Sequence, residues 1–245
     1  QNNSFQKASF INSTNAIAGS VYNSYNNATE YLHLKVANES LAEENALLRA
    51  QIPNAFYDNK LDTLSIKDTL HHQQYITAKV VNNTVTKRNN YLTLNRGSIH
   101  GVRPESGVVT SGGVVGIVKD VSEHYCSVLS LLHKDTKISA KIDKSNYFGS
   151  LVWEGGNARY ATLLDIPKHV DLKVGERIVT TSYSSIFPEN ITIGTILSWE
   201  VKPGDNFYTI KIHLSTNFAN ISYVYIINNL MKEEQKQLEG LIQND

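Results

Sequence analysis

Glycines gather in one stretch of the sequence, at the spacing that comes closest to a known chemical motif. Gly107 and Gly112 are spaced as in a phosphate-binding loop, whose backbone amides wrap phosphates while a Lys and a Ser or Thr meet the charge and the metal. The next two positions are Gly113 and Val114, so both of those side chains are missing. We therefore predict a hairpin whose Ser-Gly-Gly turn supplies positive φ angles, and no phosphate binding. A further glycine, Gly116, permits a bulge or the close approach of another strand.

Side chains that bind metals occur just after these glycines. His124 and Cys126 would share one face of a strand, and His133 follows them. A zinc site usually takes three or four protein ligands, and the sequence offers no fourth at a familiar spacing. We therefore predict an ordinary buried cysteine and two surface histidines, with no metal and no cofactor. Because this cysteine has no second one to pair with, an intramolecular disulfide is excluded.

A serine protease is the enzyme that the order of residues leaves open. His100, Asp143 and Ser182 follow the order of a chymotrypsin-like enzyme built on two barrels, in which the three side chains must meet in space. However, neither Ser111 nor Ser182 lies in a Gly-x-Ser-x-Gly sequence. With 8 His residues among many Ser and Asp, such triplets arise easily by chance. We predict that the chain is not an enzyme and keep the two-barrel protease as an alternative.

The charge balance argues against a nucleic-acid partner. The 245 residues carry 23 basic and 23 acidic side chains, whereas nucleic-acid binding draws much of its affinity from neutralising phosphates. No segment reaches the roughly 20 apolar residues that a membrane-spanning helix requires. Because the first residue is glutamine and the only methionine is Met231, we expect the native start to lie upstream of this sequence.

The first 70 residues differ in composition from the rest and predict a helix that pairs with the same helix of a second copy of the chain. A heptad pattern runs from Tyr31 to Ile52 and stops at Pro53, with leucine at each d position and Asn at two of the a positions. Asn at a costs stability but favours two helices in register, because each Asn can pair with its copy. The alternative is one amphipathic helix packed on its own domain. The predicted dimer seam consists of Leu34, Asn38, Leu41, Asn45, Leu48 and Ile52.

From about residue 75 the hydrophobic period changes to two. Short runs rich in Val, Ile, Tyr and Thr alternate with Gly, Asn, Asp and Pro, which indicates a sandwich or a barrel. In Phe207–Leu214, for example, Tyr208, Ile210, Ile212 and Leu214 would share one face of a strand. Two stretches that each read strand, Thr-Ser, loop and strand suggest two related β units. The last residues, 229–245, return to helical spacing and predict a helical or disordered tail.

Several short motifs follow one another along the chain, and their order is more specific than any one of them. They are Asn95-Arg96-Gly97-Ser98, Gly101-Val102, Gly113-Val114-Val115-Gly116, Ser127-Val128, Thr181-Ser182, Phe187-Pro188 and Ile193-Gly194. In this order they resemble the family of the rod shape-determining protein MreC, over about residues 30–205. The stretch after Thr181-Ser182 departs from the family's common glycine-rich pattern, which leaves the loop conformation there open.

The resemblance implies a mainly β fold, with an N-terminal α-helix as a coiled coil followed by two small antiparallel β-barrels. We then expect a helical dimerisation segment over 1–70 and a paired barrel module over 75–228. The module would divide near 120–145, and whether one barrel is inserted in the other stays open. The family's organisation further implies a single membrane helix ahead of this sequence, with the chain itself in the periplasm.

The role that the resemblance implies is that of a non-enzymatic scaffold of the cell-elongation complex. Such a scaffold maintains cell shape by binding and activating the class B penicillin-binding protein that crosslinks peptidoglycan, and it acts with MreD, RodA and MreB. We also expect a homodimer or a higher self-assembly. Tyr183 and Phe187 are the predicted partner contacts, because interface hot spots favour aromatic side chains, although core packing is the alternative for Phe187. A periplasmic adaptor of an export pump is a second alternative. It is disfavoured because the sequence has one heptad segment, and this segment precedes all the predicted strands.

Overall fold

The computed structural model describes residues 40, 41, 44, 45, 48, 73–145 and 147–242. The chain divides into two compact units, residues 1–45 and residues 46–245. In the first unit the described residues are helical. The strands of the described residues lie in the second unit.

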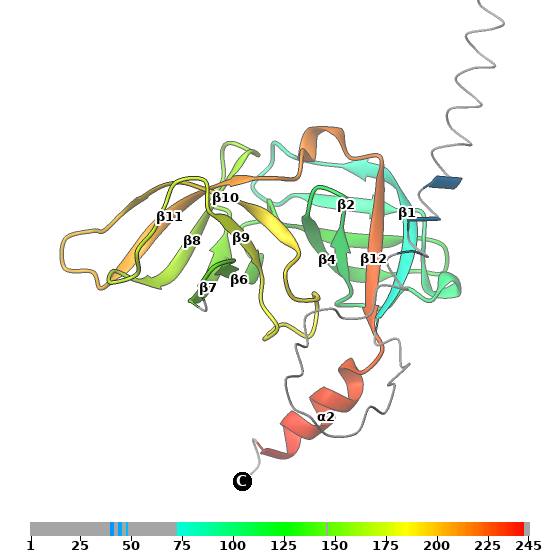
Figure 1. Cartoon of the computed structure of the whole chain (residues 1–245). Coiled ribbons are helices and arrows are strands. Elements are labelled where there is room, and N and C mark those ends of the chain that lie inside the picture. The colour runs from blue at the N-terminus through cyan, green and yellow to red at the C-terminus, as the bar shows by residue number, and fades with distance from the viewer. Residues whose placement is uncertain (1–39, 42–43, 46–47, 49–72, 146, 243–245) are drawn as a thin grey trace, which may run out of the picture. The chain divides into compact units, whose positions relative to one another are not determined.

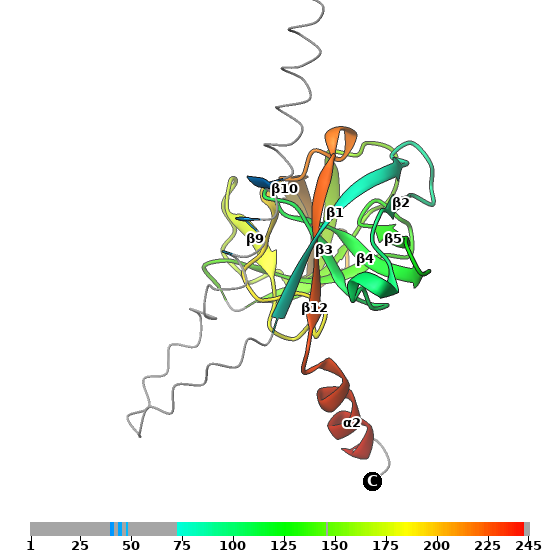
Figure 2. The same ribbon diagram turned by 90° about the vertical axis from the view of Figure 1, so that its right-hand side faces the viewer.

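Six antiparallel strands close the first barrel. Around the barrel, each pairs with the next in the order β1, β12, β3, β4, β5, β2 (Figure 2). A short 3-10 helix, Ser98–His100, follows β2, and another, Phe218–Asn220, precedes β12. The strands are β1 Gln73–Asn83, β2 Tyr91–Leu94, β3 Gly107–Val109, β4 Val114–Val121, β5 Cys126–Ser130 and β12 Tyr223–Asn229.

The second barrel is inserted in the first, between β5 and β12. Its six strands are also antiparallel and close in the order β10, β11, β8, β7, β6, β9 (Figure 1). The prediction of two small antiparallel barrels is thus confirmed. The strands are β6 Lys137–Ile142, β7 Phe148–Val152, β8 Tyr160–Pro167, β9 Arg177–Thr180, β10 Thr192–Glu200 and β11 Phe207–Leu214.

The period of two in the sequence corresponds to the two faces of these strands. In β11, Ile210, Ile212 and Leu214 are buried, whereas Lys211 and His213 between them are exposed. Because successive side chains of a strand point to opposite faces, one face of β11 lines the barrel core and the other meets solvent. The predicted apolar face of this strand is confirmed.

The glycine-rich stretch is a hairpin, as predicted. The backbone N–H of Thr110 donates to the carbonyl of Gly113 at 2.8 Å, and β3 pairs with β4 on either side of the turn. Of the two turn glycines only Gly113 has a positive φ, 142°. An ideal Cβ on Gly116 would lie 2.2 Å from the carbonyl oxygen of Leu129 on β5, so this position requires glycine for the close approach of a neighbouring strand.

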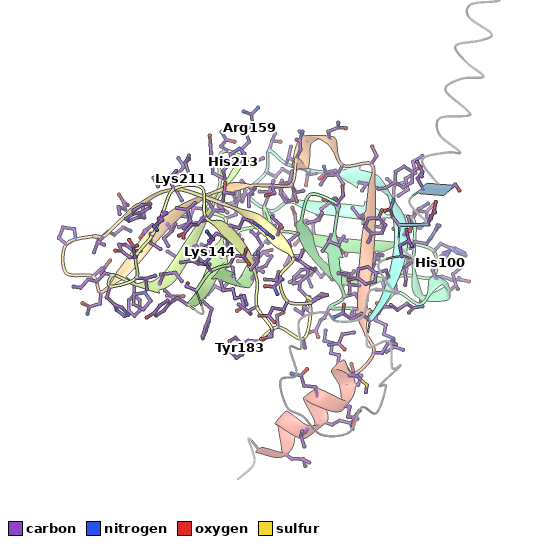
Figure 3. All side chains as sticks on the ribbon, viewed as in Figure 1. His100, Lys144, Arg159, Tyr183, Lys211 and His213 are labelled. Atoms are coloured by element: carbon purple, nitrogen blue, oxygen red, sulfur yellow. The ribbon has the colours of Figure 1, made fainter. Side chains whose placement is uncertain are left out.

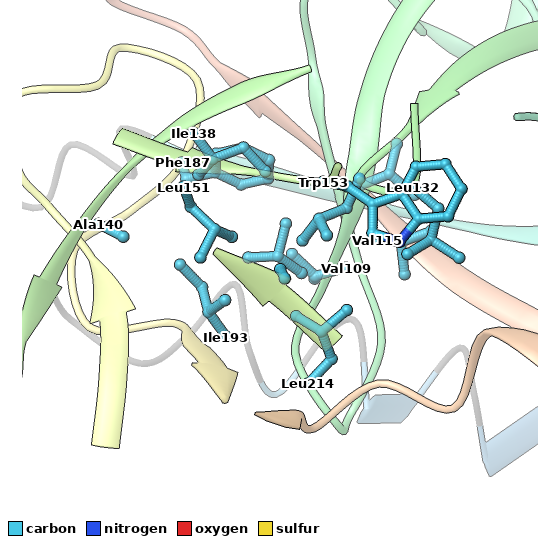
Figure 4. Close-up of a cluster of buried hydrophobic side chains, with 14 of the residues drawn as sticks. Val109, Val115, Leu132, Ile138, Ala140, Leu151, Trp153, Phe187, Ile193 and Leu214 are labelled. Atoms are coloured by element: carbon cyan, nitrogen blue, oxygen red, sulfur yellow. The ribbon is translucent and has the colours of Figure 1, made fainter. Parts of the chain in front are cut away.

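One continuous set of buried apolar side chains joins the two barrels. Figure 4 shows Val109 and Val115 of the first barrel near Trp153 and Leu214, which belong to the second. The chain crosses between the barrels at residues 131–136 and again at 215–222. At the second crossing Thr216 donates its hydroxyl to the carbonyl of Val114 at 3.0 Å, in a buried position. The barrels are therefore packed against each other through both apolar and polar contacts.

A helix, α2 (Lys232–Ile242), follows the last strand. The Lys232 side chain is mostly buried, and its Nζ donates to the backbone carbonyl of Glu105 at 2.9 Å and pairs with the Glu105 carboxylate at 3.0 Å. These contacts fix the start of α2 to the first barrel. Among the described residues, no helix has the length and apolar content needed to cross a membrane.

Candidate partner-binding surface

Three exposed aromatic side chains lie on the second barrel and form what we call the aromatic patch: Tyr147, Phe148 and Tyr183. Their side chains are 40%, 51% and 75% exposed, respectively. The Phe148 and Tyr183 rings lie 5.0 Å apart between centroids and are tilted at 47°, although Phe148 begins β7 and Tyr183 lies in the loop between β9 and β10. Figure 3 shows Tyr183 on the outside of the second barrel. Large exposed rings that already contact each other are typical of surfaces that bind other proteins.

The third ring of the patch is held by a histidine. The Tyr147 hydroxyl lies 3.2 Å from Nε2 of His169, and the two rings meet edge to face with centroids 5.5 Å apart. Because both partners stay exposed, this contact orients the ring without burying it. The patch is therefore presented in a defined arrangement.

A shallow groove of about 450 Å³ continues from the aromatic patch across the outside of the barrel. Tyr147 and Phe148 line one part of it, so patch and groove form one surface. Its walls combine apolar side chains with one lysine and one aspartate, a composition suited to an apolar side chain with a polar neighbour. The lining residues are Lys137, Ile138, Ser139, Tyr147, Phe148, Gly149, Ser150, Asp165 and Pro167.

The loop that carries Tyr183 is tied down at both ends and to both barrels. The Thr180 hydroxyl donates to the carbonyl of Pro188 at 2.6 Å and accepts from the N–H of Ile191 at 2.9 Å. From the first barrel, the amide of Asn229 donates to the carbonyl of Ser185 at 3.1 Å. These bonds reduce the ordering cost that a flexible loop would incur on binding.

The neighbouring aromatic of this loop has a different role. Phe187 is 4% exposed and packs between the barrels, where an ideal Cβ on Gly107 would lie 2.7 Å from its Cδ1. Phe187 thus follows the core-packing alternative and offers no surface, and we leave it out of the binding proposal. Tyr147 and Phe148 were not predicted, although two adjacent aromatics beside a strand that alternates by burial would have been the signal.

The three candidate metal ligands are not gathered into a site. Cys126 is buried, as predicted, and burial raises the pKa of its thiol to about 11. His124 is exposed. The prediction of two surface histidines is wrong for His133, which is 2% exposed and has its Nε2 3.1 Å from the hydroxyl of Tyr91. Tyr91 lies on the face of β2 opposite to the buried Leu92 and Leu94. Within the described residues, no group of three or more His, Cys, Asp or Glu side chains could hold a metal ion.

The candidate protease residues also have separate partners. His100 lies on the first barrel, where its Nδ1 accepts the N–H of Gly97 at 3.1 Å (Figure 3). Asp143 follows β6 of the second barrel and pairs with Arg177 at 3.5 Å. Ser182 is exposed in the loop after β9. The fold therefore places the histidine on a different barrel from the other two residues.

The predicted dimer seam lies partly outside the described residues, since Leu34, Asn38 and Ile52 are not among them. Leu41, Asn45 and Leu48 are helical and exposed in this single chain. The pairing of two such helices stays a prediction.

Taken together, the two closed barrels and their shared core define a mainly β protein of paired six-stranded barrels. The family model described as rod shape-determining protein MreC, barrel core, matches residues 80–228. The chain belongs to the MreC family.

Relatives and solved structures agree with this assignment. The chain is 29% identical over 202 residues to the cell shape-determining protein MreC of Listeria monocytogenes, covering 76% of this chain and 67% of that protein. A solved structure of MreC from Listeria monocytogenes is similar with a TM-score of 0.60 at 25% identity, over 82% of this chain and 91% of the other. A complex between penicillin-binding protein PBP2 and MreC from Helicobacter pylori contains a chain of similar fold, with a TM-score of 0.50 at 16% identity, over 64% of this chain and 98% of that one.

Proposed function

We propose that this chain is a non-enzymatic scaffold of the bacterial cell-elongation complex, and that its second barrel binds a class B penicillin-binding protein. Family membership supports the role in determining cell shape. The observation that carries the partner is the exposed aromatic patch, on a fold shared with the MreC chain of a solved PBP2 complex. Binding would activate the transpeptidase by holding it in one arrangement.

The rest of the organisation follows from the same proposal. The chain works in the periplasm, held at the inner membrane by a single helix upstream of this sequence, and contacts MreD and RodA there and MreB across the membrane. The heptad segment joins two copies. In such an arrangement the barrels would stand away from the membrane and present the aromatic patch to the partner.

The patch makes the proposal testable with one tyrosine and a matched control. Tyr183→Ala removes the most exposed ring of the patch, and Tyr125→Ala removes an exposed ring from the first barrel. A binding hot spot costs at least about 2 kcal/mol when truncated, so we expect Tyr183→Ala to weaken binding roughly thirtyfold. The measurement is biolayer interferometry with the class B penicillin-binding protein of the same organism.

The possible results test the identity of the partner and the position of its binding surface independently. If the unchanged chain does not bind, the proposed partner is wrong. If it binds and both variants bind equally well, the partner stands and the patch is not its surface. Unfolding curves of both variants that match the unchanged chain show that any loss is local.

A further inference from the structure

A buried histidine lies where the chain first crosses from one barrel to the other. His133 belongs to residues 131–136, which join β5 to β6, and it is 2% exposed. The backbone turns tightly there: the N–H of His133 donates to the carbonyl of Ser130 at 3.1 Å, and the N–H of Thr136 donates to the carbonyl of His133 at 3.0 Å. His133 thus belongs to a tight turn in the segment that joins the two barrels.

The hydrogen bonds of the ring require neutral imidazole. Nδ1 accepts the backbone N–H of Asp135 at 3.1 Å, so the proton of the ring is on Nε2. Nε2 lies 3.1 Å from the hydroxyl of Tyr91 on β2, and the two rings meet edge to face at 4.9 Å. One neutral ring therefore connects the crossing to the first barrel.

The charged groups around the ring set how readily it takes up a proton. Burial lowers the pKa of His133 most, while the Asp135 carboxylate raises it and the ammonium groups of Lys119 and Lys134 lower it further. Lys119 on β4 has its Nζ 3.5 Å from the Tyr91 hydroxyl. The Asp135 carboxylate lies 3.8 Å from Nδ1 and is exposed. Asp135 therefore offers its backbone N–H as a donor to the neutral ring and its carboxylate as an acceptor to the protonated ring.

We propose that His133 is a pH-sensitive latch on the crossing between the barrels. A proton from solvent that adds to Nδ1 removes the acceptor of the Asp135 N–H and creates a donor that faces the Asp135 carboxylate. The ring then exchanges its bond to the backbone for one to the side chain, and the turn at residues 133–136 loosens. This inference concerns the joint between the barrels and holds whatever partner binds the aromatic patch.

The direction of the pH dependence follows from where each form binds the proton. A released histidine takes up a proton near its ordinary pKa of about 6.5, whereas the latched ring resists protonation until a lower pH. Above that range both forms are neutral and the latch is fully stable. As the pH falls through it, the released form alone gains a proton, so the latch weakens by up to roughly tenfold between pH 7.5 and 5.5.

Amide hydrogen exchange of the ¹⁵N-labelled chain, followed by NMR, tests the latch. After correction for the intrinsic effect of pH, we expect exchange of the Asp135 amide to rise by up to roughly tenfold between pH 7.5 and 5.5. In His133→Gln, which cannot titrate, the corrected rate should stay constant. The control His124→Gln, at an exposed histidine, should behave like the unchanged chain.

A corrected rise of less than about twofold in the unchanged chain overturns the proposal, as does an equal rise in His133→Gln. If His133→Gln does not fold, the imidazole ¹⁵N shifts of the unchanged chain decide. Protonation of Nδ1 over the pH range in which the Asp135 amide signal moves supports the latch. A ring that titrates while that amide stays fixed, or that stays neutral to the acid limit of folding, refutes it.

Discussion

Replacing Phe187 by alanine would test whether the barrels share one core. The side chain is 4% exposed, and it fills space that Gly107 leaves open on β3 of the other barrel. Truncating a buried phenylalanine usually costs about 3–5 kcal/mol, because the lost apolar contacts are joined by the cost of the cavity. We expect this loss in full, since the ring is enclosed by backbone and by other buried side chains.

The glycine opposite provides a second perturbation from the same geometry. An added Cβ in Gly107→Ala would lie 2.7 and 2.8 Å from two ring atoms of Phe187 and 2.8 Å from the carbonyl oxygen of Ile186. Overpacking of this kind costs about 1–3 kcal/mol. With the ring removed as well, only the clash with the Ile186 backbone remains. The double variant should therefore lose less than the sum of the two, by about 1 kcal/mol.

Guanidinium unfolding of the 245-residue chain measures these differences. Tyr183→Ala, which removes an exposed ring from the same loop, serves as the control and should stay within about 0.5 kcal/mol of the unchanged chain. A loss below about 1 kcal/mol for Phe187→Ala, with an unchanged slope against denaturant, would refute the shared core. Strict additivity of the double variant would show that the two residues do not meet.

Two further predictions concern the cysteine and the helical segment. The thiol of Cys126 should not react with DTNB at pH 8 in the native chain and should react fully in guanidinium. The reason is that burial raises the pKa of this thiol to about 11 and only the thiolate attacks. Rapid labelling of the native chain would contradict the placement of Cys126 in the core. Asn38→Leu should change the oligomeric state or the register of the predicted coiled coil, since it removes a polar a-position pair. Equilibrium sedimentation of a well-folded variant with unchanged mass would count against the coil.

Local sequence patterns were sufficient to predict features that depend only on backbone geometry. The alternation in β11 follows from the two-sided geometry of any strand, so the buried positions Ile210, Ile212 and Leu214 could be assigned in advance. The hairpin at Gly113 could also be predicted from the sequence, because glycine adopts a positive φ without the steric strain that other residues incur. The two barrels were predicted only with the help of a family resemblance, since periodicity does not distinguish a sandwich from a barrel.

Whether Phe187, Tyr183 and His133 are buried or exposed could be known only from the tertiary structure. Two aromatics in one loop have the same local signal, yet one is buried because a glycine from the other barrel leaves room for it. His133 was predicted to lie on the surface, but its ring is buried and contacts the Tyr91 hydroxyl and the Asp135 N–H. The sequence by itself determined the strands, their buried faces and the absence of a familiar catalytic motif. Which side chains became core, latch or surface was decided by contacts between segments far apart in the chain, because burial depends on what packs against a residue and not on its neighbours in sequence.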